Sequence, residues 1–436
     1  MGTYIDLTVA GLSLDSSKNS MGIDYGVLFQ EGDTTHRRSD QLNYDYYEHH
    51  PEPDLAASEA AFVRPLARVL PRLNLLGYTL DVARAEYEEI VRQAIESRED
   101  DDDQIASASL PLMNFDEFCA FVCQYPLCDL DGTYVGHGAE DRDTRSKGRF
   151  LDDNEIARMP LLDSSDLYWS ERSYFASVVC VLSPYSMLQV FGQSPRNADA
   201  DVIWQYGPIV DSGWVDIDEF RASVGRGQSI LVATEGTSDA RILKHAIHLL
   251  SPDVADFFRF IDVDERHPFW GTGNLVKFAE GLVRIDVQNQ VIFLLDNDAE
   301  GHDAYRRLLG ISLPANMRAL LLPDLETFRQ FLARGPEGVS ACNINGRAAA
   351  IECYLDLNLP GYPPAQVLWS NYKQEVDAWH GALEYKESYM KRFLKLTRET
   401  VLESGYDTSK LQTLLEALIS EATILASGKV AHSYSA

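Results

Sequence analysis

Short apolar runs alternate with longer amphipathic segments through the middle of the chain, from residue 228 to about residue 323. The apolar runs have the length and the β-branched content of buried strands, and they are SILVAT, FFRFIDV, QVIFLLD and MRALLLP. The segments between them place apolar residues at helical spacing, in SDARILKHAIHLL, NLVKFAEGLV and AYRRLLG. Strands that alternate with helices indicate an α/β fold, in which helices cover both faces of a parallel sheet.

The segments on either side of this region have different patterns. Short strands are predicted in YIDLTVAGLSL and MGIDYGVLFQ, and two helices are predicted at 56–76 and 79–97. Beyond about Asp356 the pattern is largely helical, over 372–385, 387–404 and 409–427. We therefore expect four parts: an α+β module over 1–165, a connecting region over 166–227, an α/β domain over 228–355 and a helical region over 356–436.

Carboxylates follow two of the predicted strands. Glu235 comes after SILVAT, and Asp296 and Asp298 come at the end of QVIFLLD. Ligands bind outside the carboxyl ends of the strands in open α/β sheets, so these side chains are expected to lie at one edge of the sheet. Three neighbouring acids repel one another unless a proton or cation intervenes, and Mg²⁺ needs only one or two carboxylates besides water and substrate. The pattern favours metal-assisted chemistry on a phosphodiester.

The same residues carry a family resemblance. Glu-Gly-x-x-Asp at Glu235 to Asp239 and Asp-x-Asp-x-x-Gly at Asp296 to Gly301 resemble the Toprim domain of topoisomerases, bacterial primases and overcoming-lysogenization-defect (OLD) nucleases. The resemblance implies a Rossmann-like Toprim domain in which Glu235 is a metal ligand or general acid/base and Asp296 and Asp298 bind Mg²⁺ or Mn²⁺. Asp239 is then a further ligand. The alternative is an ordinary Rossmann-like sheet whose strand-end acids are solvated.

The two glycines of these motifs, Gly236 and Gly301, are interpreted as positions where the chain or substrate passes close to the sheet edge.

A further segment resembles the OLD-type nucleases. In NINGRAAAIECYL, Glu352 matches a glutamate of that family and is expected to complete the metal cluster. The family often has a serine shortly before this glutamate, whereas this chain has alanine at 348–350. OLD-type nucleases also use a downstream lysine, which makes Lys386 a catalytic candidate. Lys386, Lys391, Arg392 and Lys395 together are a candidate nucleic-acid-binding patch, and a solvated helix face is the alternative.

The N-terminal region is similar to a domain that is fused to HEPN or Toprim effectors in bacterial genomes. The similarity lies in MGTYIDLTVAGLSLDSSKNS and LPRLNLLGYTLDVARAEYE. It implies a role in defence against phage. Arg241 and His248 formally fit the Arg–His spacing of HEPN ribonucleases, but both lie in the helix after Glu235, so we interpret this fit as coincidence.

Composition limits the partners and the compartment. The net charge of −29 lacks the basic footprint of most nucleic-acid binders, so contact with nucleic acid must rely on cations and local basic patches. No apolar run has the length of a membrane span, no signal peptide is recognisable, and six cysteines without a secretory context suggest a reducing cytoplasm. Cys119 and Cys123 invite a zinc interpretation with Cys128 and His137, but packing in an amphipathic helix is favoured.

Two functions are consistent with these features. The first is a Mg²⁺- or Mn²⁺-dependent nuclease that cleaves DNA or RNA as an effector of prokaryotic anti-phage defence. No GxxxxGK[ST] motif is present, so a regulatory or sensor subunit is an expected partner, and a homo-oligomer is compatible with the sequence. The second is a non-enzymatic acidic scaffold or binding subunit of a defence complex.

Overall fold

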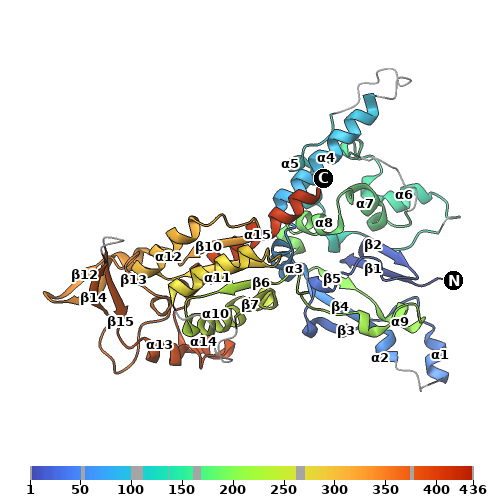
Figure 1. Ribbon diagram of the computed structural model, residues 1–436. Coiled ribbons are helices and arrows are strands. Elements are labelled where there is room, and N and C mark those ends of the chain that lie inside the picture. Colours follow the sequence, from blue (N-terminus) through green and yellow to red (C-terminus); the bar gives the residue numbers. More distant parts are fainter. Residues whose placement is uncertain are drawn as a thin grey trace. The chain divides into compact units, whose positions relative to one another are not determined.

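The computed structural model describes residues 2–50, 55–99, 111–136, 138–160, 168–261, 271–373 and 378–434. The chain forms two compact units (Figure 1). The first comprises Met1–Val224 together with Val430–Ala436, and the second comprises Gly225–Lys429. The acidic segment EDDDD at 99–103 has the composition of a solvated loop, and it lies outside the described residues apart from its first residue. His137 also lies outside the described residues.

An antiparallel sheet of five strands forms the centre of the first unit. The strands follow the order β2-β1-β5-β4-β3, and their bounds are Tyr4–Val9 (β1), Leu12–Lys18 (β2), Thr34–His36 (β3), Ala60–Pro65 (β4) and Asp201–Trp204 (β5). Alternate residues of β1 are buried, as the predicted strand requires. Because β5 pairs with both β1 and β4, residues 201–204 lie in the middle of this sheet.

Helices surround this sheet. They are α1 (Tyr44–His49), α2 (Leu55–Ser58), α3 (Leu66–Leu75), α4 (Leu80–Glu99), α5 (Phe115–Gln124), α6 (Arg142–Lys147), α7 (Glu171–Val179), α8 (Pro184–Phe191) and α9 (Gly207–Asp211). The predicted helix at 79–97 is confirmed by α4. The predicted helix over 56–76 is wrong in its first half, where β4 lies between α2 and α3. Phe62 is buried there against Phe29 and Trp204, and this packing outweighs the helical spacing of the sequence.

The predicted strand in MGIDYGVLFQ is also wrong. Its apolar residues lie in a 3-10 turn, η1 (Gly26–Leu28), and a second turn, η2 (Glu31–Asp33), follows it. Val27, Leu28 and Phe29 are all buried, so this segment fills the core without pairing as a strand.

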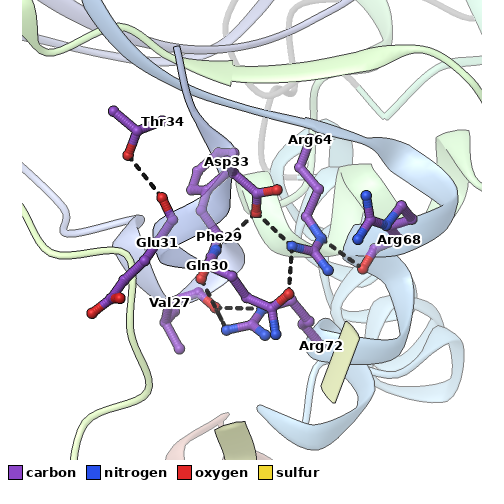
Figure 2. Close-up of polar contacts among 9 residues, drawn as sticks. All are labelled: Val27, Phe29, Gln30, Glu31, Asp33, Thr34, Arg64, Arg68 and Arg72. Carbon is purple, nitrogen blue, oxygen red and sulfur yellow. Dashed lines mark hydrogen bonds and ion pairs between the residues drawn. The ribbon is translucent and has the colours of Figure 1, made fainter. Parts of the chain in front are cut away.

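Two buried arginine side chains join these turns to β4 and α3 (Figure 2). The guanidinium of Arg64 on β4 forms an ion pair with Asp33 and donates a hydrogen bond of 3.0 Å to Gln30 Oε1. The guanidinium of Arg72 on α3 donates to the carbonyl of Val27 over 2.8 and 2.9 Å. A buried cation is stable only when it is paired and hydrogen-bonded, so both arginines fix the turns in place.

A parallel sheet of four strands forms the centre of the second unit. The order is β10-β8-β6-β7, with bounds Ile230–Ala233 (β6), Phe258–Phe260 (β7), Gln290–Leu295 (β8) and Met317–Leu321 (β10). All three neighbouring pairs are parallel. The predicted strand QVIFLLD therefore lies beside the predicted strand SILVAT, which confirms the expected α/β arrangement with a parallel sheet.

In chain order, a helix follows each of the strands β6, β7 and β8. These helices are α10 (Thr237–Leu250), α11 (Thr272–Arg284) and α12 (Ala299–Leu309), and Figure 1 shows α10 and α11 on either side of β6. Val291 and Phe293 of β8 pack with α11 and α12 in one hydrophobic core. Arg318, which is in register with Ile292 of β8, forms a 2.6 Å ion pair with Glu421 on α15 (Ser409–Tyr434). Successive side chains of a strand point to opposite faces of the sheet, so α15 lies against the face that is opposite α11 and α12.

Further strands follow the parallel sheet. A mixed sheet has the order β12-β11-β14-β15, with bounds Phe331–Gly335 (β11), Gly338–Cys342 (β12), Val367–Lys373 (β14) and Ala378–Leu383 (β15). The predicted helix over 372–385 is therefore wrong, because its described residues belong mostly to β14 and β15. A two-stranded sheet joins β9 (Asn297–Asp298) to β13 (Ala348–Ala349).

The chain beyond these strands is helical, as expected. It forms α13 (Lys386–Phe393), α14 (Arg398–Ser404) and α15. The apolar stripe of α15 is buried at Leu411, Leu414, Leu415 and Leu418.

Within the described residues no single helix is long and apolar enough to cross a membrane. Among the helices that the structure describes, α7 and α8 together have the length and composition of a span, and they meet at a bend of 111°. Both helices contribute buried residues to the core of the first unit, including Phe175 and Phe191.

Candidate functional site

Two acidic residues lie together where β6 and β8 end. The two strands are parallel neighbours, with Ala233 in register with Phe293, so their carboxyl ends share one edge of the sheet. Glu235 follows β6, and Asp296 follows β8 directly. The backbone N–H of Asp296 donates a hydrogen bond of 3.3 Å to Glu235 Oε1. The structure thus places these two sequence candidates side by side.

Asp239 and Asp298 are held at the first turns of the helices that follow these strands. Asp239 Oδ2 accepts the backbone N–H of Gly236 at 2.9 Å, at the start of α10. Asp298 Oδ1 accepts the backbone N–H of Gly301 at 2.7 Å and caps α12. Asp239 Oδ1 also accepts the hydroxyl of Ser238 at 3.1 Å. Carboxyl groups are favoured at helix N-termini, so these hydrogen bonds hold both side chains in place.

Glu352 approaches the same edge from a distant segment. It belongs to the 3-10 turn η10 (Ile351–Tyr354) and is buried. The backbone N–H of Ile351 donates to Asp296 Oδ1 at 3.0 Å, which fixes this turn against the end of β8. Lys386 begins α13 on the other side of Glu352, with Nζ 3.9 Å from Glu352 Oε1 and 54% of its side chain exposed. The structure therefore brings Glu352 and Lys386 to the edge where Asp296 lies.

Burial and mutual repulsion perturb the carboxyl groups. Burial, together with the nearby charges of Asp298 and Asp239, raises the pKa of Glu235 to about 9. Burial and the charge of Glu352 raise the pKa of Asp239 to about 7. The pKa of Asp296 is raised well above its usual value by burial first and then by its acidic neighbours. The expected crowding is present, but burial is the larger cause.

The pKa of Asp298 is raised as well. Burial is the main cause, and the Gly301 N–H and the nearby His380 oppose it. Five acidic groups that influence one another in this way need protons or a cation to lie together at neutral pH.

The donor set fits a hydrated cation better than a closed cage of protein ligands. Among the described residues, no three His, Cys, Asp or Glu side chains are arranged to hold a metal ion together. Mg²⁺ usually keeps several waters and binds one or two carboxylates directly, and Mn²⁺ also suits oxygen ligands. Two of the carboxyl groups at this edge, such as those of Asp296 and Asp298, could provide such oxygens.

Gly301 and Gly236 differ in what they do. A Cβ on Gly301 would lie 2.0 Å from the carbonyl oxygen of Asp296, so only glycine fits this close approach. A Cβ on Gly236 would meet nothing closer than 3.5 Å, at Asp239 Oδ2, and its backbone is extended. The interpretation of Gly301 is confirmed for the chain itself, whereas at Gly236 no other part of the described chain comes this close.

The other basic candidates on and after α13 have different surroundings. Arg392 is 3.4 Å from Asp356 and lies over the ring of Tyr406, so its guanidinium holds the second unit together. Lys391 pairs with Glu387 one turn earlier at 3.4 Å, and Lys395 is exposed.

Two residues near the acidic groups were missed in the sequence. His380 on β15 has Nδ1 3.9 Å from Asp298 Oδ2. Lys410 on α15 is largely buried and donates from Nζ to the carbonyl of Cys353 at 2.8 Å, and burial lowers its pKa. No local signal marks either one: His380 lies in the segment predicted as helix, and Lys410 reaches Cys353 from 57 residues away.

The described cysteines do not form disulfides. Cys119 packs against the core of the first unit, which agrees with a packing role.

Comparison with known proteins gives one result. The family described as HEPN/Toprim N-terminal domain 1 matches residues 1–228. This range contains β1 to β5 and α1 to α9, and it ends just before β6. Neither a curated protein nor a solved structure matches the chain.

Proposed function

We propose a function from one established premise: the chain belongs to the family with the HEPN/Toprim N-terminal domain 1. The domain name associates the chain with nuclease-type effectors. The second unit is a Toprim-type, metal-dependent nuclease that cleaves phosphodiester bonds in DNA or RNA. The chain acts as an effector of prokaryotic anti-phage defence, resembles the OLD-type nucleases in this unit, and depends on a regulatory or sensor subunit for control.

The observation that carries the proposal is the gathering of acids at one sheet edge. Glu235 and Asp296 follow adjacent parallel strands and are joined by a hydrogen bond, and Asp298 and Asp239 cap the next helices. Glu352 comes from a separate turn that is fixed to Asp296 through Ile351. A solvated sheet edge would not require five acids. Three of these five side chains expose less than a tenth of their surface.

Each residue has a role that follows from its position. Asp296 and Asp298 would hold Mg²⁺ or Mn²⁺, with water completing the coordination shell, and a bound cation would activate water and stabilise the leaving oxygen. Glu235 lies beside the end of β8, where it accepts the N–H of Asp296, and in its ionised form it would accept the proton of the attacking water. Lys386 is half exposed beside Glu352, so its ammonium group can meet a substrate phosphate.

The test is cleavage of end-labelled DNA and RNA by the full chain, with and without Mg²⁺ or Mn²⁺. Glu235→Gln and Asp296→Asn should each lower the cleavage rate by at least about 100-fold, the size expected for loss of a general base or a metal ligand. Asp303→Asn is the matched control. Asp303 lies on α12 and pairs with Arg307 at 3.7 Å, outside the acidic group, so this variant should cleave like the wild type.

The result also separates the second candidate function. The net charge of −29 and the lack of a three-residue ligand group among the described residues favour an acidic scaffold. A wild type that leaves every DNA and RNA substrate intact with both metals, and that is indistinguishable from the folded variants, would replace the nuclease proposal with the scaffold.

A further inference from the structure

A cavity of about 780 Å³ lies in the second unit, between α10, β7 and the end of α13. This volume is in the range of pockets that bind small organic molecules or parts of larger ones. Its wall is formed by both apolar and basic side chains. Phe258, Ile247 and Leu394 are among the apolar ones. None of the described residues that line it is an aspartate or glutamate.

The basic residues of this wall are concentrated on one helix and the neighbouring edge strand. They are Arg241, Lys244, His245, His248 and Arg259. Five basic or imidazole side chains around one cavity are unusual in a chain with a net charge of −29. Within the part of the chain that the structure describes, neither Lys244 nor Arg259 has an ion-pair partner, and both are exposed. No described carboxylate therefore competes with an anionic ligand for these two cations.

His245 adds a polar group that points to a ligand. Its Nε2 atom is buried and has no hydrogen-bond partner among the described residues. Its ring packs edge-on against Phe393, with centroids 5.0 Å apart, so the imidazole is held in one orientation. A buried polar atom without a partner is costly, and a ligand oxygen in the cavity would satisfy it.

The cavity shares helix α10 with the acidic group. Asp239 belongs to the acidic group, Ala240 lines the cavity, and Lys244 and His248 follow on the same helix. At a rise of about 1.5 Å per residue, Lys244 and His248 lie about 7.5 and about 13.5 Å further along the helix axis than Asp239. Phosphates of one strand are spaced about 3.4 Å apart along a duplex axis, so this distance corresponds to about two to four nucleotides.

We infer that this cavity binds a nucleotide unit of the nucleic-acid strand that is cleaved at the acidic edge. The phosphate contacts Lys244, Arg259 and His245, and the base lies on the apolar wall beside Phe258. The inference rests on the proposed function for the identity of the strand, although the binding itself does not require cleavage. It also explains how so acidic a chain holds a polyanion, because the repulsive field is opposed locally by this wall.

The test measures binding without cleavage. The full chain is titrated in EDTA against fluorescein-labelled 12-nucleotide single-stranded DNA and RNA, and anisotropy is recorded at several salt concentrations. The double variant Lys244→Glu/Arg259→Glu should bind at least 10-fold more weakly than the wild type. A plot of the logarithm of the binding constant against the logarithm of salt concentration should also be less steep for this variant. Its slope should be smaller in magnitude by about 1.4, because two phosphate contacts on a single strand are lost.

Two further variants serve as controls. Arg284→Glu/Arg306→Glu makes the same change in charge on α11 and α12, outside the cavity, and should change binding less than 2-fold. Lys244→Arg/Arg259→Lys keeps both charges and should bind like the wild type. Circular dichroism and melting curves check that each variant is folded.

Each outcome bears on the inference. If Lys244→Glu/Arg259→Glu and Arg284→Glu/Arg306→Glu weakened oligonucleotide binding equally, net charge alone would control binding. The cavity would then not be the binding site. A wild type that does not bind either oligonucleotide would also overturn the inference. Displacement of the oligonucleotide by adenosine monophosphate at low millimolar concentration would show that a free nucleotide is the ligand instead of the strand.

The two proposals fail in different ways. If the cavity variant loses binding but the wild type never cleaves with metal, the nuclease proposal fails and the cavity remains a nucleic-acid site. If the wild type cleaves and the cavity variant binds as tightly as the wild type, the cavity proposal fails and the nuclease remains.

Discussion

Single residues at the sheet edge have a structural role besides the chemical one that we propose. Asp298 caps α12 through the N–H of Gly301 and keeps its second oxygen within 3.9 Å of His380. Asp239 does the same at the start of α10 through the N–H of Gly236. The cap fixes each carboxylate before any ligand arrives, which is how a small site can be organised in advance.

Gly301 makes this geometry possible, and its replacement is a direct test. Gly301→Ala would place a Cβ 2.0 Å from the carbonyl oxygen of Asp296. The turn must shift to relieve this overlap, so we expect the free energy of unfolding of the second unit to fall by about 1–3 kcal/mol, as for other overpacked sites. The measurement is the urea concentration at the midpoint of unfolding.

Gly281→Ala is the matched control for this substitution. Gly281 lies inside α11, and a Cβ there meets no atom within 4 Å. Alanine favours helix more than glycine does, so this variant should be more stable than the wild type by up to about 1 kcal/mol. Equal midpoints for the two variants would contradict the close approach at Gly301.

At the scale of elements, the first unit depends on a buried ion pair. Arg64 on β4 is fully buried and pairs with Asp33 of η2, whose side chain is 10% exposed. Asp33→Asn keeps the shape but leaves the Arg64 charge without its carboxylate. Removal of one partner of a buried pair typically costs about 3–5 kcal/mol, and we expect a loss of this size in urea unfolding of the first unit.

The control is the same substitution at an exposed pair. Asp201 on β5 pairs with Arg37 at 3.2 Å, with side chains that are 46% and 43% exposed. Asp201→Asn should cost no more than about 1 kcal/mol, because solvent screens such pairs. If both variants lost the same amount, burial would not be the reason that Arg64 needs Asp33.

At the scale of the whole molecule, the acidic group couples stability to pH. Without a metal ion, the pKa of Glu235 is raised from 4.5 to about 9 in the folded protein. Between these values the folded state keeps a proton that the unfolded state has released. The stability that this proton contributes is fully present below about pH 4.5 and is lost as the pH rises toward 9.

The prediction compares the wild type with Glu235→Gln, measured by urea unfolding in EDTA from pH 6 to pH 9. The wild type should lose stability relative to the variant as the pH rises, at a rate of up to about 1.4 kcal/mol per pH unit. Addition of Mg²⁺ should remove most of this difference, because a bound cation favours the ionised carboxylate. Parallel curves for the two proteins in EDTA would contradict the raised pKa, and Asp303→Asn should follow the wild type throughout.

Much of the second unit could be predicted from local sequence. The runs ILVA and VIFLL lie in central strands and are almost wholly buried, so they are apolar along their whole length, as is typical of buried strands. Acidic residues follow each run within three positions, and for this reason Glu235, Asp296 and Asp298 could be named together. Parallel neighbours place their carboxyl ends at one edge, so the proximity of Glu235 and Asp296 follows from the pattern.

Tertiary structure decided what depends on distant segments. Residues 60–65 and 378–383 have ambiguous local patterns, and they are strands because β5 and β14 pair with them. His380 approaches Asp298 only through that pairing, and Lys410 meets Cys353 only because α15 packs back onto η10. The basic cavity likewise combines α10, β7 and the end of α13. The local periodicity of a segment indicates which of its faces is buried. Which other helix or strand buries that face depends on the tertiary structure of the whole unit.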